Sequence, residues 1–245
     1  MQDQFKELYQ KTKKGTQDIV VVEGIHAFKH AARFGAEFVD AVTDDKKTAV
    51  ELMRHIAADA DVEHVEQYVR EISHGQFHDI ASSSLRTGIV AIAKKPVYTI
   101  ADATDKQIIF IENPHDINNV GAVVRVAAGY GVGAVAVSGE ISPWHMLAIR
   151  AGAGLQWAVP VLHIASLEDI AQGRKVCACD ANGVSIRDIK MEKNSVLIFG
   201  TEREGITHTL KEHSDQIISI PMQKGVSSLN LATSVSAVLY GGQFT

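Results

Sequence analysis

The sequence predicts an α/β protein with a mainly parallel sheet in its C-terminal part and a smaller α/β domain before it. Strand and helix patterns alternate after residue 96, which is typical of a parallel sheet covered on both faces. A length of 245 residues and a hydrophobic content of 46% allow one large packed domain or two. At Lys94-Lys95-Pro96 a strand-like run gives way to charge and proline, so we expect domains at 1–95 and 96–245.

The N-terminal domain is expected to hold an N-terminal helix followed by two helices and two strands. Apolar residues recur at helical spacing over Glu23–Phe34, and Thr48–Ala58 is expected to form a second helix. Phe38–Val42 and Gly88–Ile92 are short apolar runs typical of strands.

The C-terminal domain is expected to alternate five strands with four helices. The expected strands are Ile108–Ile111, Gly133–Val137, Val176–Cys179, Val196–Phe199 and Gln216–Ile220. The expected helices are Val120–Gly129, a helix near Trp144–Ala151, 206–212 and Leu229–Leu239. Gly129–Gly133 resembles a phosphate loop, but it follows a helix, so a helix stop and turn explains it better.

The junction before the last helix is the most informative part of the chain. Pro221 cannot donate to a sheet ladder, so the preceding strand must end there. Ser227 or Ser228 is a natural N-cap, and Asn230 is expected in the first turn of the helix. Free N–H groups at a helix start suit a ligand that carries a carboxylate or a phosphate.

Two other segments are also strand–loop–helix junctions. Asn113–Arg125 follows the apolar run Ile108–Ile111, and Leu197–Ile206 passes through a glycine-containing loop. In an open α/β sheet, the loops at the carboxyl ends of the strands gather at one edge, where ligands bind.

These three segments, in this order, resemble the SpoU (TrmH) family of RNA ribose 2′-O-methyltransferases. The family motifs fall on Asn119, Gly121 and Arg125; on Gly200, Glu202 and Gly205; and on Ile220-Pro221-Met222 with Ser228-Leu229-Asn230. More loosely, Glu23–Ala27 and Thr87–Ala91 resemble the L30-like domain that precedes many of these enzymes and helps bind RNA.

The resemblance implies S-adenosylmethionine as cofactor, RNA as substrate, a trefoil knot in the C-terminal domain, and a homodimer with the site near the subunit interface. Ribosomal RNA is favoured over transfer RNA, because the L30-like extension is commoner among relatives that act on ribosomal RNA. The implied cofactor contacts are Phe199, Gly200, Thr201, Ile220, Met222, Ser228 and Leu229.

The resemblance also implies a catalytic set of Arg125, Asn119, Glu202 and Asn230. A guanidinium stays charged, so Arg125 suits phosphate binding and alkoxide stabilisation better than proton abstraction. Glu202 is expected to fix Asn119 or the arginine, and Asn230 and Ser228 either to hydrogen-bond within the site or to cap the helix. Three basic residues are candidate RNA contacts, with simple surface exposure as the alternative: Arg150, Arg203 and Lys224.

Charge bears on how RNA would be held. The formal net charge is −5, from 24 basic and 29 acidic residues, which argues against extensive non-specific phosphate contact. A dimer would let two modest basic surfaces act together. The apolar residues of the last helix, Leu231, Val235, Val238 and Leu239, are interpreted as part of that dimer interface, with burial of the helix within its own subunit as the alternative.

Other classes of function are less well supported. The i,i+4 pairs His26/His30 and His74/His78 lack a third ligand, so no metal is expected, and Cys177 and Cys179 are expected to be reduced thiols on a strand. Trp144 and Trp157 are expected to pack around the sheet or at a subunit interface.

No apolar run reaches the ~20 residues of a membrane helix, and the start lacks a signal-peptide core, so the cytoplasm is the expected compartment. A dinucleotide enzyme is disfavoured because no Gly-x-Gly-x-x-Gly follows the first strand of the second domain. A catalytically idle RNA-binding protein of the same fold remains the alternative.

Overall fold

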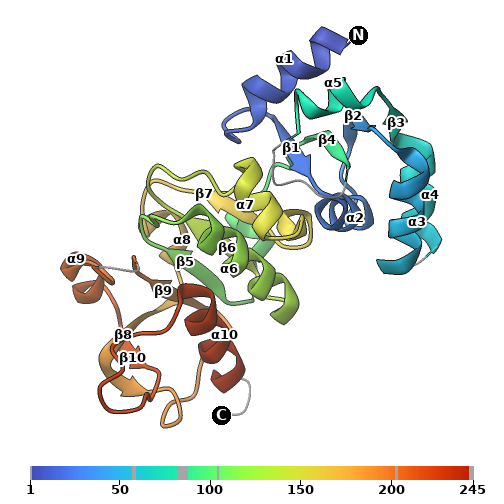
Figure 1. Cartoon of the computed structure of the whole chain (residues 1–245). Helices are drawn as coiled ribbons and strands as arrows, with labels where there is room; N and C mark the ends of the chain where they lie inside the picture. Colours follow the sequence, from blue (N-terminus) through green and yellow to red (C-terminus); the bar gives the residue numbers. More distant parts are fainter. Residues whose placement is uncertain (1, 57–58, 82–87, 104, 202–203, 243–245) are drawn as a thin grey trace. The chain divides into compact units, whose positions relative to one another are not determined.

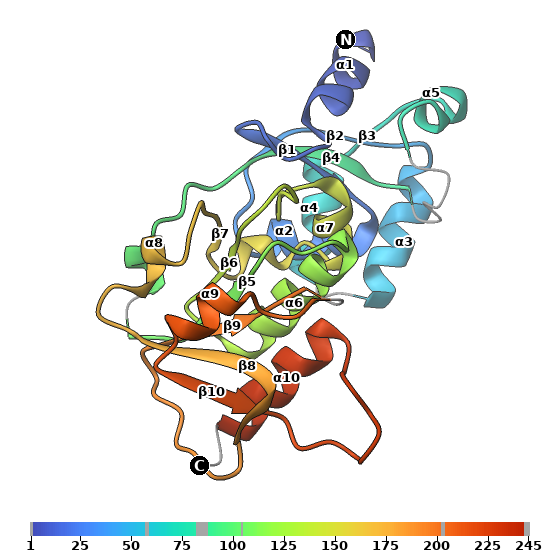
Figure 2. The same cartoon turned by 90° about the vertical axis from the view of Figure 1, so that its left-hand side faces the viewer.

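A computed structural model describes residues 2–56, 59–81, 88–103, 105–201 and 204–242 (Figures 1 and 2). The chain divides into two compact units. The first comprises Met1–Val97 with Trp144–Ala158, and the second comprises Tyr98–Pro143 with Val159–Thr245. Among the described residues, no helix has the length and apolar character needed to cross a membrane.

The described strands of the first unit form a mixed four-stranded sheet in the order β1-β4-β2-β3. Their bounds are β1 Ile19–Glu23, β2 Phe38–Thr43, β3 Arg70–Glu71 and β4 Val90–Lys94. β4 runs antiparallel to both β1 and β2, whereas β2 and β3 are parallel. The helices are α1 Gln2–Thr12, α2 Ile25–Arg33, α3 Lys46–Ile56, α4 Asp59–Tyr68, α5 His74–His78 and α7 Met146–Ala151.

Strand β1 was not predicted from the sequence, although its residue pattern is typical of a buried strand. Residues Ile19–Val22 are four consecutive β-branched residues, and Val20–Val22 are fully buried between the layers. Gly24 has a φ of 100°, a conformation that separates the strand from α2. Glu23 therefore ends the strand, and the predicted helix begins two residues later, at Ile25.

Segment 144–158 lies within the first unit although it is inserted between strands of the second. Its helix α7 packs on β1, and the Arg150 Nη1 atom lies 3.3 Å from Oε2 of Glu23, a side chain with no solvent exposure. Trp144 and Trp157 are buried and meet edge to face with ring centroids 5.3 Å apart. The expectation that the two tryptophans serve packing is confirmed.

The described strands of the second unit form a six-stranded sheet in the order β10-β8-β9-β5-β6-β7, and every pairing is parallel. The predicted parallel sheet is therefore confirmed. Strand bounds are β5 Ile108–Ile111, β6 Ala134–Val137, β7 Val161–His163, β8 Lys175–Ser185, β9 Ser195–Phe199 and β10 Gln216–Ser219. The helices are α6 Ile117–Tyr130, α8 Glu168–Ala171, α9 His208–Glu212 and α10 Leu231–Gly242. The trefoil knot stays a prediction.

The last helix corrects one interpretation made from the sequence. α10 packs against α6 (Figure 1), and the Tyr130 and Ser236 hydroxyls lie 3.3 Å apart between them. The four apolar residues assigned to a dimer interface, Leu231, Val235, Val238 and Leu239, are all buried within their own chain. That interpretation is wrong, because helix α6 of the same chain packs against the apolar face of α10.

Candidate active site at the carboxyl edge of the parallel sheet

A pocket of about 390 Å³ lies in the second unit where the carboxyl ends of β8, β9 and β10 meet. All seven residues expected to contact a cofactor line this pocket. The full lining is Cys179, Asp180, Ala181, Phe199, Gly200, Thr201, Glu204, Gly205, Ile220, Met222, Ser227, Ser228, Leu229, Leu231 and Ser234. Parallel strands bring these segments together because their carboxyl ends share one edge.

The loop after β9 forms one wall of the pocket and is closed on itself. Thr201 and Gly205 exchange backbone hydrogen bonds, each with an N–O distance of 3.1 Å. A Cβ atom at Gly200 would collide with the backbone of Gly205, so the close approach requires glycine at that position. Gly200 therefore has a packing reason, and Gly205 has a conformational one, since its φ of 69° lies in the left-handed region.

The loop after β10 leads into α10 (Figure 2), and five of its residues also line the pocket: Ile220, Met222, Ser227, Ser228 and Leu229. The helix begins at Leu231, and Asn230 caps it by accepting a hydrogen bond from the Ala232 N–H at 3.0 Å. Ser227 and Ser228 lie before the cap, in the exposed loop, so their assignment as N-caps is wrong. The placement of Asn230 in the first helical turn is also wrong, since Asn230 directly precedes the helix.

Asn230 also reaches the first motif. Its Nδ2 donates to Oδ1 of Asn119 on α6 at 2.9 Å, so two of the predicted catalytic residues are in direct contact. α6 itself starts with the Asp116 carboxylate capping the Asn118 N–H at 2.8 Å, and ends at Gly131 in the left-handed region. The predicted helix stop over Gly129–Gly133 is confirmed.

Arg125 lies on α6 with an exposed side chain. Within the described residues, its guanidinium has neither a hydrogen bond nor an ion pair to another side chain. An exposed guanidinium in this state can form a bidentate contact with an incoming phosphate.

One wall of the pocket is polar. The Asp180 carboxylate forms an ion pair of 2.6 Å with Lys211 of α9, and the hydrogen bond from Lys211 lowers the pKa of Asp180. Next to it, burial raises the pKa of the Cys179 thiol to about 12, with the Asp180 charge acting in the same direction. At neutral pH the pocket therefore presents a carboxylate and a protonated thiol.

The structure does not bring every predicted site residue to this pocket. Glu202 and Arg203 lie outside the described residues. Lys224 is exposed in the loop between β10 and α10. Arg150 belongs to the first unit, where it pairs with buried Glu23. The ion pair gives Arg150 a structural role, and its contact with RNA stays a prediction.

Cys179, Asp180 and Ala181 were not predicted as lining residues. The pairing of β10 with β8 shifts from Ile217–Ala178 to Ile218–Val184, so residues 179–183 leave the ladder and bulge at the pocket. The parallel topology was a usable signal, because it places the end of β8 at the same edge as the ends of β9 and β10.

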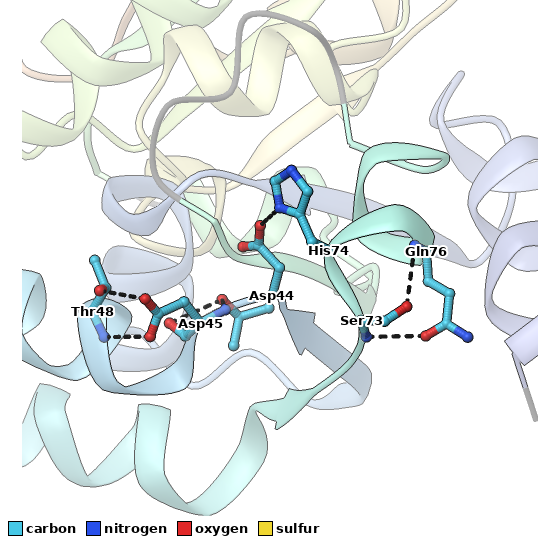
Figure 3. A network of polar contacts seen from close by, with 7 residues as sticks. Asp44, Asp45, Thr48, Ser73, His74 and Gln76 are labelled. Atoms are coloured by element: carbon cyan, nitrogen blue, oxygen red, sulfur yellow. Dashed lines mark hydrogen bonds and ion pairs between the residues drawn. The ribbon is translucent and has the colours of Figure 1, made fainter.

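The histidine pairs form ordinary polar contacts. His74 Nδ1 lies 2.7 Å from Oδ2 of Asp44 in a network that includes the Ser73–Gln76 capping box of α5 (Figure 3). His30 Nδ1 lies 2.7 Å from the Ala153 carbonyl oxygen. No group of three or more His, Cys, Asp or Glu side chains in the described part of the chain is placed to hold a metal ion.

Comparison with known proteins gives a consistent result. The model of a family described as SpoU rRNA Methylase matches residues 106–240, more than half of the chain. The 23S rRNA (guanosine-2′-O-)-methyltransferase RlmB of Haemophilus influenzae is 26% identical over 214 residues, which cover 84% of this chain and 77% of that protein. A protein of Mycolicibacterium smegmatis that is described as an uncharacterized tRNA/rRNA methyltransferase is 31% identical over 146 residues, 57% of this chain. The aligned stretch spans only 46% of that relative.

Solved structures share the whole fold. The SpoU methyltransferase AviRb from Streptomyces viridochromogenes, solved with the cofactor AdoMet, superposes with a TM-score of 0.79 at 19% identity. The superposition covers 97% of this chain and 96% of that chain.

Proposed function

Because the chain belongs to the SpoU rRNA methylase family, we propose that it methylates a ribose 2′-hydroxyl of RNA with S-adenosylmethionine as the methyl donor. The match to the family model confirms the assignment to the SpoU family that the three sequence motifs indicated. The observation that carries the proposal is the pocket of about 390 Å³, whose lining contains all seven residues expected to contact the cofactor.

The chemistry of the lining suits S-adenosylmethionine. Phe199, Ile220, Met222 and Leu229 give an apolar slot for an adenine ring, beside the exposed polar backbone of the two loops. The Asp180 carboxylate and the Ser228 hydroxyl are acceptors for the ribose hydroxyls or the ammonium group. The bound cofactor supplies a methyl group activated by its positive sulfonium.

Arg125 and the Asn119–Asn230 pair act on the RNA side in this proposal. Arg125 binds a phosphate next to the target ribose and stabilises the negative charge that develops on the 2′-oxygen. Asn230 holds the Asn119 amide in one orientation, which positions it for the ribose or the cofactor. The proton of the 2′-hydroxyl passes to phosphate or solvent.

Ribosomal RNA is the proposed substrate class. The support is the similarity to RlmB, described as a 23S rRNA methyltransferase, over 84% of this chain, a larger share than the second unit alone provides. We propose that this small α/β unit corresponds to an L30-like domain and helps to bind RNA. Transfer RNA is the competing substrate, because the M. smegmatis relative is described as a tRNA/rRNA methyltransferase.

Mapping 2′-O-methyl groups in total RNA from cells with and without this protein tests the proposal. Loss of one methyl group in ribosomal RNA is the expected result. Loss at a tRNA position would assign the competing substrate. If no methyl group is lost and the purified protein binds RNA and transfers no methyl group, the chain is a catalytically idle binder.

A further inference from the structure

We propose that Glu112 is a positioning residue, which holds together the two ends of the cofactor-binding loop after β9. Glu112 is not one of the residues that match the three motifs. The inference rests on the proposed function, since the loop in question is the Gly200–Gly205 wall of the pocket. It adds a residue to which no role in cofactor binding has been assigned.

Glu112 contacts both ends of this loop. It directly follows β5, and its backbone N–H donates to the carbonyl oxygen of Phe199, the residue just before the loop, at 3.0 Å. Its carboxylate accepts two hydrogen bonds from Thr207, just after the loop. The Thr207 N–H lies 2.9 Å from Oε2, and the Thr207 hydroxyl lies 2.7 Å from Oε1. One residue therefore joins the entrance and the exit of the loop.

The loop has few other anchors at its exit. Ile206 is buried in the core of the second unit, but the helix α9 that follows contains no buried residue. Leu210 of α9 packs against the same core, and the Lys211–Asp180 ion pair lies at the far end of that helix. Thr201 and Gly205 hold each other, but these bonds lie within the loop and do not tie it to β5. Among the described residues, the Glu112 carboxylate links the exit of the loop to the end of β5, so its loss would make the spacing of the pocket wall less well defined.

The geometry predicts an effect on cofactor affinity. Two charge-assisted hydrogen bonds to a partly exposed carboxylate are weaker than buried ones, because water competes for the same donors. A less ordered loop must be ordered when the cofactor binds, so affinity falls while the chemical step at saturating cofactor changes little.

Glu112→Gln is the informative variant, because the amide keeps the shape but removes the charge, so that neutral hydrogen bonds replace the two charge-assisted ones to Thr207. We expect S-adenosylmethionine to bind about threefold to tenfold more weakly by calorimetry. KM for the cofactor should rise by the same factor, with kcat changed less than about twofold. Glu140→Gln is the matched control. Glu140 is an exposed carboxylate three residues after the end of β6, and it forms neither a hydrogen bond nor an ion pair with the described residues of the loop. The variant should therefore bind S-adenosylmethionine as tightly as the wild type.

Thr207 gives an independent pair of variants. Thr207→Ser keeps the hydroxyl and should retain the affinity, whereas Thr207→Val removes both the 2.7 Å hydrogen bond and the N-cap of α9 and should weaken binding at least as much as Glu112→Gln does. Folded variants with wild-type affinity and KM would overturn the role of Glu112 and leave the proposed function standing. A wild-type protein that binds no S-adenosylmethionine would overturn both.

Discussion

The side-chain amides of Asn230 and Asn119 meet at 2.9 Å, with Asn230 Nδ2 donating to Asn119 Oδ1. Asn230 Oδ1 is meanwhile engaged by the Ala232 N–H at the start of α10, which fixes the direction in which its Nδ2 points. A helix cap thus orients one amide, and that amide orients the next. Residues 111 positions apart in sequence are joined at one edge of the sheet.

Substitutions at Asn230 should separate the capping role from the orienting role. Asn230→Ala loses both, and we expect about 1 kcal/mol less stability together with a loss of methyl transfer of about tenfold or more. Serine is an equally good N-cap, so Asn230→Ser should restore the stability but leave transfer impaired. Thermal unfolding and single-turnover methyl transfer measure the two effects. Full activity in Asn230→Ser would show that the contact with Asn119 is not used.

Local patterns in the sequence predicted the parallel sheet, and the resemblance to the SpoU family implied the seven lining residues of the pocket. Strands that end at a proline or a glycine loop are visible in single segments, and parallel topology places their ends together. The bulge at residues 179–183 and the Glu112–Thr207 contact depend on the pairing register and on residues 95 positions apart. Neither leaves a periodic signal in the sequence. The burial of α10 was missed for the same reason, since the helix α6 that covers it is far away in the chain.

Arg125 should be needed for transfer and dispensable for cofactor binding. It is exposed on α6 and does not line the pocket. We expect Arg125→Ala to abolish methyl transfer while calorimetry shows nearly unchanged affinity for S-adenosylmethionine. Arg125→Lys should restore little, because an ammonium group cannot form the bidentate contact. Retained transfer in Arg125→Ala on the true RNA substrate would place the catalytic group elsewhere.

Arg150 should behave as a stabilising residue of the first unit. Glu23 has no solvent exposure, so Arg150→Ala leaves a buried carboxylate without this partner, at a cost of about 3 kcal/mol. Adding Glu23→Gln to that variant should recover part of the loss, since a neutral amide costs less to bury. Denaturant unfolding measures both variants. Wild-type stability in Arg150→Ala, combined with weaker RNA binding, would favour the RNA contact instead.

The Cys179 thiol should make the second unit sensitive to alkali. Its pKa in the folded chain is raised from 9.0 to about 12, so the folded state holds the proton more tightly than the unfolded state. The resulting stability is fully present below about pH 9 and is lost as the pH rises toward 12. Cys179→Ala should flatten the fall in unfolding temperature across this range. Burial and the Glu23 charge also raise the pKa of Tyr9 to about 12. The first unit of the Cys179→Ala variant should therefore still lose stability in alkali.

The same shift predicts slow thiol chemistry. At pH 8 Cys179 is almost entirely protonated, and the thiolate is the reactive form. Iodoacetamide should therefore label it at least on the order of 100-fold more slowly than a free thiol. Rapid labelling of the native protein at this pH would contradict the burial of the thiol.

A homodimer stays a prediction. The apolar residues of α10 no longer support it, because they are buried within their own chain, but other exposed apolar residues do. Large apolar side chains of the second unit are exposed at Val226, Leu229 and Tyr240, with exposed fractions of 48%, 39% and 60%. Val226 and Leu229 belong to the loop that walls the pocket, so a second copy seated there would bury apolar surface and restrict the loop. Two copies would also present two first units to one RNA, so that two modest basic surfaces act together although each chain has a net charge of −5.

Light scattering at micromolar concentration should give the mass of a C2 dimer. Tyr240→Asp places a charge in the expected interface and should shift the protein toward monomer. Val97→Asp is the control, because Val97 is 92% exposed but lies in the first unit, and its variant should remain dimeric. If the wild-type chain is monomeric and transfers methyl groups at full rate, the exposed residues of the loop serve the substrate, and a single first unit must suffice to hold the RNA.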